Sequence, residues 1–438
     1  MFRLVFKESR GDSIKKPVGY RKRLVEKQLD EYIESFGAVS IEGPKFCGKT
    51  WTGLSRSNSV IFMGDPKNNF QNRTLAKIDP SFVLEGERPH LIDEWQEVPE
   101  LWDAVRFEVD KNQGKGKFIL TVSSTPNHKG IMHSGTGRIG KIRMSTMSLF
   151  EIGDSSGHVS LNELFSGKFK PCLTGEVKLD DLISFVVRGG WPDDANLNKK
   201  MWGNTAREYL KTVVDDDMFA VDGVKRDVKK VWALLHSLGR NESTIVSNTT
   251  LRKDIENIDD ELIDPSTISD YLNIFNRLFI LDDQPSFNTK LRLTRRILKS
   301  PKRHFVDPSL AVAALGATKE MLFNDLNTFG FLFESLCSHD LKIYANYNNA
   351  NLFHYRDEKG NEIDAIIELP DGRFGAFEIK LGTDKIDKAA SDLIKFSSIM
   401  EKEGKKAPAI LCVICGLTSA AYLRDDGVYV IPITALRE

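Results

Sequence analysis

The sequence of 438 residues predicts a multidomain α/β protein that begins with a parallel sheet covered by helices. The first observation behind this prediction is that strand-like apolar runs alternate with helix-like segments over residues 38–150. The second is a mainly helical pattern over residues 180–320. The third is a new alternation of strands and helices over residues 319–438, which predicts a further, smaller α/β domain.

The bulk composition is that of an ordinary globular chain. Hydrophobic residues make up 41% of the sequence and charged residues 28%. The net charge is −1, so the whole chain is not a basic nucleic-acid binder, and any such binding must come from local patches. The five cysteines are scattered, and no segment reads as a secretory signal or a membrane span. We therefore expect a cytoplasmic protein.

The strands of the first domain are expected where apolar residues run together. They are residues 38–43, 59–65, 89–94 and 116–124. A helix is expected over residues 98–113, between the third and fourth strands. Strands that alternate with helices in this way indicate crossover connections and hence a parallel sheet.

A phosphate-loop pattern follows the first predicted strand. It consists of Gly, four residues, Gly, Lys and Thr, and the predicted nucleotide-binding residues are Gly43, Pro44, Lys45, Phe46, Cys47, Gly48, Lys49, Thr50 and Trp51. The glycines let backbone amides turn toward phosphate, Lys49 supplies a cation to the terminal phosphates, and the Thr50 hydroxyl can hold Mg²⁺. The pattern lies between a strand and a helix-capable segment, which is the context that such a loop requires.

Charged and polar residues at later strand ends complete this predicted site. Asp93 is expected to position Mg²⁺, and Glu94 to polarise the attacking water. Ser123 ends the fourth strand and is a candidate sensor of the terminal phosphate, with an ordinary turn serine as the alternative. Arg138 and Arg143 are candidate arginine fingers, in cis or from a neighbouring subunit, with a surface basic cluster as the alternative.

These motifs, together with "GRIGKIRMSTMSLFE", "RGGWP" and "GFLFESL", resemble the predicted AAA+-type ATPases of bacteria and archaea that carry an uncharacterised carboxy-terminal region. The resemblance covers most of the chain and implies an AAA+-like domain over residues 1–155 that binds and hydrolyses ATP, with Mg²⁺ as the metal. The family usually has Gly where this chain has Val122. The resemblance supplies no established cellular role.

The second domain, residues 156–318, is predicted to be mainly helical. One helix is expected to start at Asp264-Pro265, and a strand is expected to follow it over residues 278–284, which together outline a winged helix. A basic run comes next, and its residues predicted to bind DNA are Lys290, Arg292, Arg295 and Arg296, followed by Lys299, Lys302 and Arg303. A solvated charged loop, or a winged helix that binds protein, remains the alternative.

Charged residues lie on the predicted strands of the third domain. Asp364 and Glu378 are on successive strands joined by the turn "LPDGR", which can bring the two acids together. Glu378 and Lys380 are two residues apart and therefore face the same side of their strand. Two carboxylates can hold Mg²⁺, Lys380 can stabilise charge that develops on phosphorus, and Glu334 on the preceding helix is a further candidate ligand. A surface hairpin with scattered charges is the alternative.

Asp364, Glu378 and Lys380, within a helix, a three-stranded meander, a helix and a strand, resemble the PD-(D/E)XK nuclease superfamily. The Pro that usually precedes the first acid is replaced by Ile363. The resemblance implies a restriction-endonuclease-like domain over residues 319–438, with Asp364, Glu378 and Lys380 as catalytic residues.

The combined expectation is a protein that hydrolyses ATP and acts on DNA through a Mg²⁺-dependent nuclease-type domain. The first alternative is an ATP-driven switch whose last domain binds nucleic acid or a protein partner without cleaving. A second is a signalling ATPase that does not contact nucleic acid. A homo-oligomer is implied only if an arginine finger acts between subunits.

Overall fold

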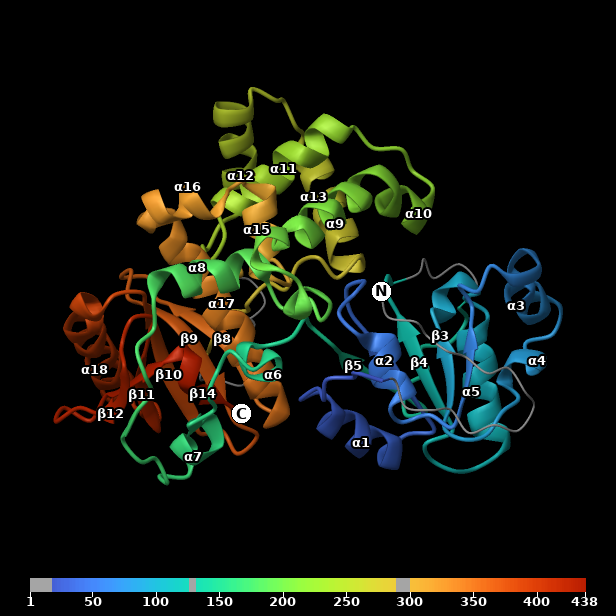
Figure 1. The fold of residues 1–438 in the computed structure, drawn as a ribbon, viewed down its shortest axis with the longest axis horizontal. Coiled ribbons are helices and arrows are strands. Elements are labelled where there is room, and N and C mark those ends of the chain that lie inside the picture. Colours follow the sequence, from blue (N-terminus) through green and yellow to red (C-terminus); the bar gives the residue numbers. More distant parts are fainter. Residues whose placement is uncertain (1–17, 126–130, 289–299) are drawn as a thin grey trace. The chain divides into compact units, whose positions relative to one another are not determined.

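The computed structural model describes residues 18–125, 131–288 and 300–438, and the chain divides into two compact α/β units (Figure 1). Unit 1 comprises the chain up to Ser145 together with Ala220–Gly223 and Arg277–Phe279. Unit 2 comprises Thr146–Phe219, Val224–Asn276 and Ile280–Glu438. The expected boundary between residues 318 and 319 falls inside unit 2, so the helical region and the last α/β region form one compact body.

Unit 1 is built on a five-stranded sheet with the order β2-β3-β4-β1-β5, in which all neighbours are parallel. The strands are β1 (Ala38–Glu42), β2 (Ser59–Phe62), β3 (His90–Asp93), β4 (Phe118–Val122) and β5 (Ile139–Arg143). The first four are the strands that the sequence predicts, which confirms the parallel sheet. Because all strands run the same way, the residues after β1, β3 and β4 meet at one edge of the sheet.

Helices cover both faces of this sheet. They are α1 (Glu26–Ser35), α2 (Lys49–Leu54), α3 (Lys67–Ile78), α4 (Ser81–Leu84) and α5 (Leu101–Lys111). One core cluster joins Trp95 and the apolar side of α5 to the sheet, and another joins Leu29 of α1 and Leu54 of α2 to it. Burial on both faces explains why the strands read as continuous apolar runs in the sequence.

Unit 2 contains a seven-stranded mixed sheet with the order β7-β12-β13-β11-β10-β9-β8. Its strands are β7 (Cys172–Leu173), β8 (Asn351–Arg356), β9 (Glu362–Glu368), β10 (Phe374–Lys380), β11 (Ile410–Cys415), β12 (Ala420–Leu423) and β13 (Tyr429–Pro432). Strands β8, β9 and β10 form an antiparallel meander, and β10 then pairs in parallel with β11. The edge strand β7 comes from well before the expected start of the last domain, as does β6 (Val159–Ser160), which pairs with β14 (Leu436–Arg437).

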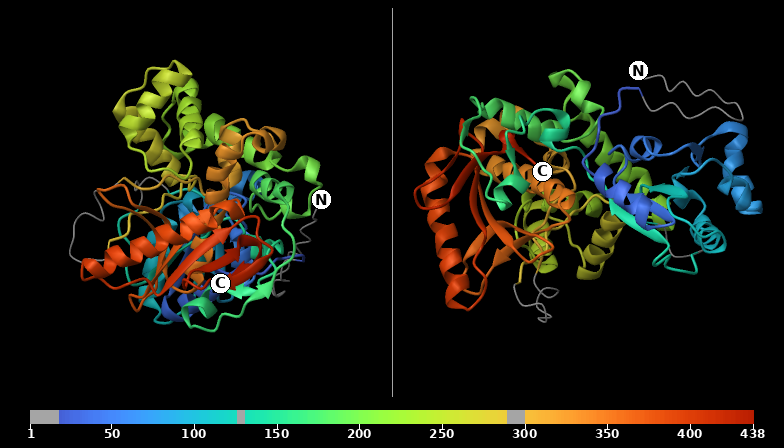
Figure 2. Two further views of the ribbon diagram at one scale, coloured as in Figure 1. Left: turned by 90° about the vertical axis from the view of Figure 1, so that its left-hand side faces the viewer. Right: turned by 90° about the horizontal axis from the view of Figure 1, so that it is seen from below.

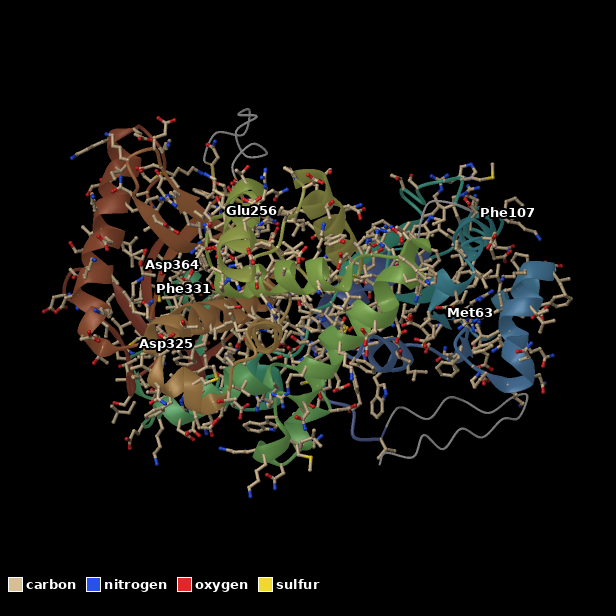
Figure 3. The ribbon with its side chains drawn as sticks, turned by 90° about the horizontal axis from the view of Figure 1, so that it is seen from above. Met63, Phe107, Glu256, Asp325, Phe331 and Asp364 are labelled. Carbon is tan, nitrogen blue, oxygen red and sulfur yellow. The ribbon has the colours of Figure 1, made fainter. Side chains whose placement is uncertain are left out.

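Two long helices pack against this sheet. Helix α18 (Ile386–Lys402) runs along one face, where Leu393 and Phe396 join the core formed with β9, β10 and β11 (Figure 2). Where the sequence predicts one helix before the three-stranded meander, the structure has two, α16 (Lys319–Asn324) and α17 (Leu326–Tyr347). Asp325, which is labelled in Figure 3, separates them. Its carboxylate accepts a hydrogen bond from the Thr328 amide at 3.1 Å and caps α17.

The rest of unit 2 is mainly helical, as predicted. The helices that begin before α16 are α6 (Leu149–Ile152), α7 (Leu161–Phe165), α8 (Leu179–Arg188), α9 (Asn204–Thr212), α10 (Met218–Asp222), α11 (Val228–Arg240), α12 (Asn248–Asp254), α13 (Pro265–Arg277) and α15 (Pro308–Ala314), and the ends of α10 and α13 belong to unit 1. Helix α13 starts at the predicted proline. The strand expected over residues 278–284 is reduced to isolated antiparallel bridges, Leu281 with Phe305, and Lys302 with both Gln284 and Ile245.

Several motif residues of the first family resemblance form a buried network in unit 2. The Asp307 carboxylate accepts hydrogen bonds from the Thr146 hydroxyl at 2.6 Å and from the Gly190 amide at 2.8 Å. Gly189 is required there, because its φ is +70° and a Cβ would lie 2.2 Å from Asp307 Oδ1. The "RGGWP" motif is therefore explained by packing and needs no catalytic role.

No helix within residues 18–125, 131–288 and 300–438 is both long enough and apolar enough to cross a bilayer.

Candidate functional site

The predicted nucleotide-binding residues form one loop between β1 and α2. A Cβ at Gly43 would lie 2.1 Å from the Met144 carbonyl oxygen, so only glycine allows the loop to start against the backbone that follows β5. Gly48 has φ +101° at the start of α2, a conformation that favours glycine. Lys49 is buried, and its ammonium folds back to donate to the Pro44 carbonyl oxygen at 2.7 Å. The loop therefore holds its own cation beside the backbone that would surround a phosphate.

Two hydroxyls hold Asp93 at the end of β3. Thr50 Oγ1 and Thr121 Oγ1 each donate to Asp93 Oδ1 at 2.7 Å. Burial raises the pKa of Asp93, and these hydrogen bonds oppose the rise. The Thr50 hydroxyl and the Asp93 carboxylate supply hard oxygen atoms side by side, which fits the preference of Mg²⁺. Thr121 was not singled out from the sequence, although a polar residue inside the apolar run "FILTV" is a signal.

Glu94 is fixed in a left-handed backbone conformation with φ +56°. Its amide donates to Thr121 Oγ1 at 3.0 Å, and its carboxylate accepts a hydrogen bond from the Ser123 hydroxyl at 2.6 Å. The Gln96 side-chain amide donates to the same carboxylate and to Ser123 Oγ. The structure thus brings the predicted sensor Ser123 against the residue expected to polarise water. Gln96 belongs to this arrangement and was not anticipated.

The two candidate arginine fingers lie at opposite ends of β5. Arg138 precedes the strand, where its carbonyl accepts from the amide of Ala38 at the start of β1, and its guanidinium binds Asp110 at 2.8 Å. The phosphate loop follows the other end of β1, so Arg138 does not fit a finger in cis. Arg143 lies opposite Glu42 in the register of β5 with β1, at the loop edge, and its guanidinium lies 5.0 Å from the Phe279 ring centroid. A role for Arg138 in a neighbouring subunit remains a prediction.

Unit 2 brings together a second set of charged side chains, which we call the acid-lysine cluster. Its members are Lys302, Glu334, Glu362, Asp364, Glu378 and Lys380. Lys380 Nζ lies 2.6 Å from Glu378 Oε2 and 3.0 Å from Asp364 Oδ2. Lys302 Nζ lies 2.6 Å from Glu334 Oε1, and 3.7 Å from both Glu362 Oε1 and Asp364 Oδ1. Asp364 lies among the orange and red elements of Figure 3.

Burial and mutual charge shift the pKa values of these groups. Burial, followed by the neighbouring Asp364 carboxylate, raises the pKa of Glu378 to about 8. Burial also raises the pKa of Glu334. Burial acts in the same direction on Asp364, but Lys380 and Lys302 outweigh it and lower the pKa of that carboxyl. The Lys302 side chain is 1% exposed and Lys380 is 29% exposed, so the cluster meets solvent near Lys380.

The metal ligands predicted for this region were Glu334, Asp364 and Glu378. Over the part of the chain that the structure describes, no three His, Cys, Asp or Glu side chains are grouped so that they could hold a metal ion. The reason is visible in the cluster, where Lys302 binds Glu334 and Lys380 binds the other two acids. The cluster nevertheless contains more carboxyl groups than ammonium groups, four against two.

The residues predicted to bind DNA, Lys290, Arg292, Arg295 and Arg296, lie outside the described residues, as does Lys299. Two other members of that basic run are not on a solvated loop. Lys302 is buried in the acid-lysine cluster, and Arg303 binds Asp283 and the Asn248 side chain. The exposed face of α13 carries neutral polar residues and an acid, which are Ser266, Ser269, Asp270, Asn273 and Asn276. Helix α13 therefore presents no basic surface of its own.

Comparison with known proteins agrees with the geometry of unit 1. Residues 35–153 match the family model described as an AAA domain. Residues 179–321 and 329–436 match two families described as domains of unknown function, DUF8612 and DUF4143. Uncharacterized proteins of Mycobacterium bovis and Mycobacterium tuberculosis are each 23% identical to this chain over 360 residues, which covers 78% of this chain and 70% of each of them.

Two solved structures are similar at lower levels. A Walker-type ATPase of Pyrococcus abyssi has a TM-score of 0.40 at 11% identity and covers 67% of this chain and 96% of its own. A RuvB variant of Thermotoga maritima has a TM-score of 0.27 at 16% identity and covers 60% of this chain and 89% of its own. Structural similarities this low do not bear on the function of this chain. The AAA domain match and the loop geometry together identify residues 35–153 as an ATPase-like P-loop domain.

Proposed function

We propose that this protein binds and hydrolyses ATP in unit 1 and acts on DNA through a metal-dependent nuclease-type site in unit 2. The observation that supports the nuclease-type site is that Lys380 Nζ lies 2.6 Å from Glu378 Oε2 and 3.0 Å from Asp364 Oδ2. They lie on adjacent strands of the meander that follows α17 and precedes α18.

In unit 1, the polar side chains of the P-loop site each have a role in ATP hydrolysis. With nucleotide bound, Lys49 would exchange the Pro44 carbonyl for the terminal phosphates, and Thr50 and Asp93 would hold Mg²⁺, which would neutralise phosphate charge. Glu94 orients and polarises the attacking water. Ser123 and Gln96 hold the Glu94 carboxylate, so that its position does not depend on the nucleotide alone.

In unit 2, Asp364 and Glu378 would hold the metal, which supplies a Lewis acid at the scissile phosphate. Lys380 would stabilise the charge that develops on that phosphate. The bridges of Lys302 with Ile245 and Gln284, together with α11, α12 and α13, support a winged-helix interpretation of the helical region. The basic residues 290–296 would then contact the DNA backbone in a sequence-independent way.

A second candidate is an ATP-driven switch that binds its target without cleaving it. It is favoured by one specific observation, namely that Lys302 and Lys380 already neutralise much of the acid charge in unit 2. In this alternative, the acid-lysine cluster is a structural ion-pair network.

The test is cleavage of supercoiled plasmid with Mg²⁺ or Mn²⁺, with and without ATP. We expect Asp364→Asn to abolish cutting, and Lys49→Ala to remove the dependence on ATP. Asp371→Asn is the matched control, because Asp371 lies in the turn between β9 and β10, half-exposed beside Arg373. Absence of cutting under all conditions, with ATP hydrolysis intact, would favour the switch.

A further inference from the structure

We infer that Lys302 is an internal cation that takes the place of a divalent metal ion in the acid-lysine cluster. Metal binding there then requires the Lys302 ammonium to leave Glu334 and Asp364. The inference deepens the proposed function, since it rests on the assignment of this cluster as a metal site and names what regulates the site.

The position of Lys302 is that of a bound cation. Its ammonium faces three carboxylates, at 2.6 Å from Glu334 and at 3.7 Å from Glu362 and Asp364. It is 1% exposed and contacts an acid from α17 and two acids from β9. Lys380 differs, because it lies on β10 beside its own partner Glu378 and is partly exposed. Lys302 therefore pairs with Glu334 and Glu362 and shares Asp364 with Lys380.

A separate part of the chain brings Lys302 into the cluster. The Lys302 backbone exchanges hydrogen bonds with Gln284, from amide to carbonyl at 3.0 Å and in return at 2.9 Å. The Gln284 side-chain amide also donates to the backbone oxygen of Asp364 at 3.2 Å. The bridged segments around residues 284 and 302 thus position the lysine, while α17 and β9 position the acids. A shift of these segments against the sheet would vacate the cation position.

Electrostatics gives the expected consequence of removing this lysine. Without Lys302, Lys380 would be the one ammonium left among the side chains of the cluster, and it pairs with two of the four acids, Asp364 and Glu378. Buried like charges repel strongly, so the cluster would either take up protons or bind a cation. Lys302→Met keeps an unbranched apolar side chain of similar length and removes the ammonium with its charge and hydrogen bonds, so it should create a tighter divalent-ion site.

The experiment measures Mn²⁺ binding by calorimetry on the full chain, without nucleotide and without DNA. We expect Lys302→Met to bind Mn²⁺ at least about tenfold more tightly than the natural protein, since one competing charge is removed. Thermal unfolding of the variant should also become dependent on Mn²⁺. Lys342→Met is the matched control, because Lys342 is also a partly buried lysine of unit 2, paired with Asp282 at 2.5 Å, and its loss should leave Mn²⁺ affinity unchanged.

Glu334 should be needed for the gain. The double variant Lys302→Met with Glu334→Gln is expected to lose the added Mn²⁺ affinity and to fold without metal. Equal or weaker Mn²⁺ binding by Lys302→Met would overturn the inference, as would a gain that survives in the double variant. If Lys302→Met does not fold alone, recovery on refolding only with Mn²⁺ supports the inference, and recovery in neither condition overturns it.

The proposed nuclease function and the inference about Lys302 can be rejected independently of each other. A gain of Mn²⁺ affinity in Lys302→Met, combined with no plasmid cleavage by any form of the protein, would reject the nuclease and leave the cation exchange standing. Cleavage by the natural protein without a gain in Lys302→Met would do the reverse.

Discussion

The P-loop site and the acid-lysine cluster hold their acids by different means. In unit 1, neutral donors bind the carboxylates, with the Thr50 and Thr121 hydroxyls on Asp93 and the Ser123 hydroxyl on Glu94. In unit 2, ammonium groups do so, as in the contacts of Lys302 with Glu334 and of Lys380 with Glu378. The first site leaves its negative charge to be balanced by a ligand, whereas the second balances most of its own.

Because of this difference, a ligand should enter the P-loop site more easily than a cation enters the acid-lysine cluster. In the P-loop site, the Lys49 ammonium donates to a neutral carbonyl and not to a carboxylate. Magnesium and nucleotide that enter this site therefore displace only hydrogen bonds to neutral groups, which are weak. A cation that enters the acid-lysine cluster must instead compete with buried ion pairs, which are costly to break.

The largest effect is expected in the P-loop site, when the charge of Glu94 is removed. Glu94→Gln is expected to lower kcat for ATP hydrolysis by about 100-fold or more, since an amide cannot polarise water as a carboxylate does. Nucleotide binding should be retained, and both quantities are measured by phosphate release and by titration with a fluorescent ATP analogue. Glu97→Gln is the matched control, because Glu97 pairs with Arg73 at 2.6 Å and should leave kcat unchanged. Normal hydrolysis by Glu94→Gln would show that Glu94 does not polarise the attacking water.

Removal of a lysine from the acid-lysine cluster should lower the stability of the folded protein. Lys380→Met leaves Asp364 and Glu378 without their shared partner and is expected to lower the free energy of unfolding by about 2–3 kcal/mol. Lys385→Met, at an exposed lysine 3.6 Å from Asp384, should change it by less than about 0.5 kcal/mol. Urea unfolding in EDTA measures both. Equal effects of the two substitutions would contradict the contrast between the sites.

A smaller effect is expected from the hydroxyl that holds Glu94. Ser123→Ala should lower kcat about tenfold with KM nearly unchanged, because the general base would still be present but less well oriented. Ser123→Thr keeps the hydroxyl and should restore most of the rate in steady-state assays. A change confined to KM would instead indicate that Ser123 contacts the nucleotide.

The pH dependence of stability provides the finest distinction. The pKa of Glu378 is raised to about 8 in the folded protein, so folding takes up a proton between the unfolded value near 4.5 and pH 8. Stability should therefore fall as pH rises through this window, because the unfolded chain releases that proton at a lower pH than the folded one. Glu378→Gln should remove that slope when the two proteins are compared by urea unfolding at pH 5.5 and pH 8 in EDTA. An unchanged slope in the variant would assign it to another group.

Much of unit 1 could be predicted because its signals are local. The phosphate loop is a run of consecutive residues, and Asp93 and Glu94 directly follow an apolar strand. Thr121 and Gln96 were missed, because their importance arises only when β4 and β3 lie side by side and bring them to the two acids.

In unit 2, the sequence by itself determined the meander and the shared face of Glu378 and Lys380, since strand alternation and a short turn fix both. Only the tertiary structure decided that Lys302, expected on a solvated basic run, is the buried partner of Glu334. It also decided that β7 completes the sheet and that Arg143, not Arg138, lies at the loop edge. The physical reason is that pairing between distant segments depends on what becomes buried together, which no local pattern of residues encodes.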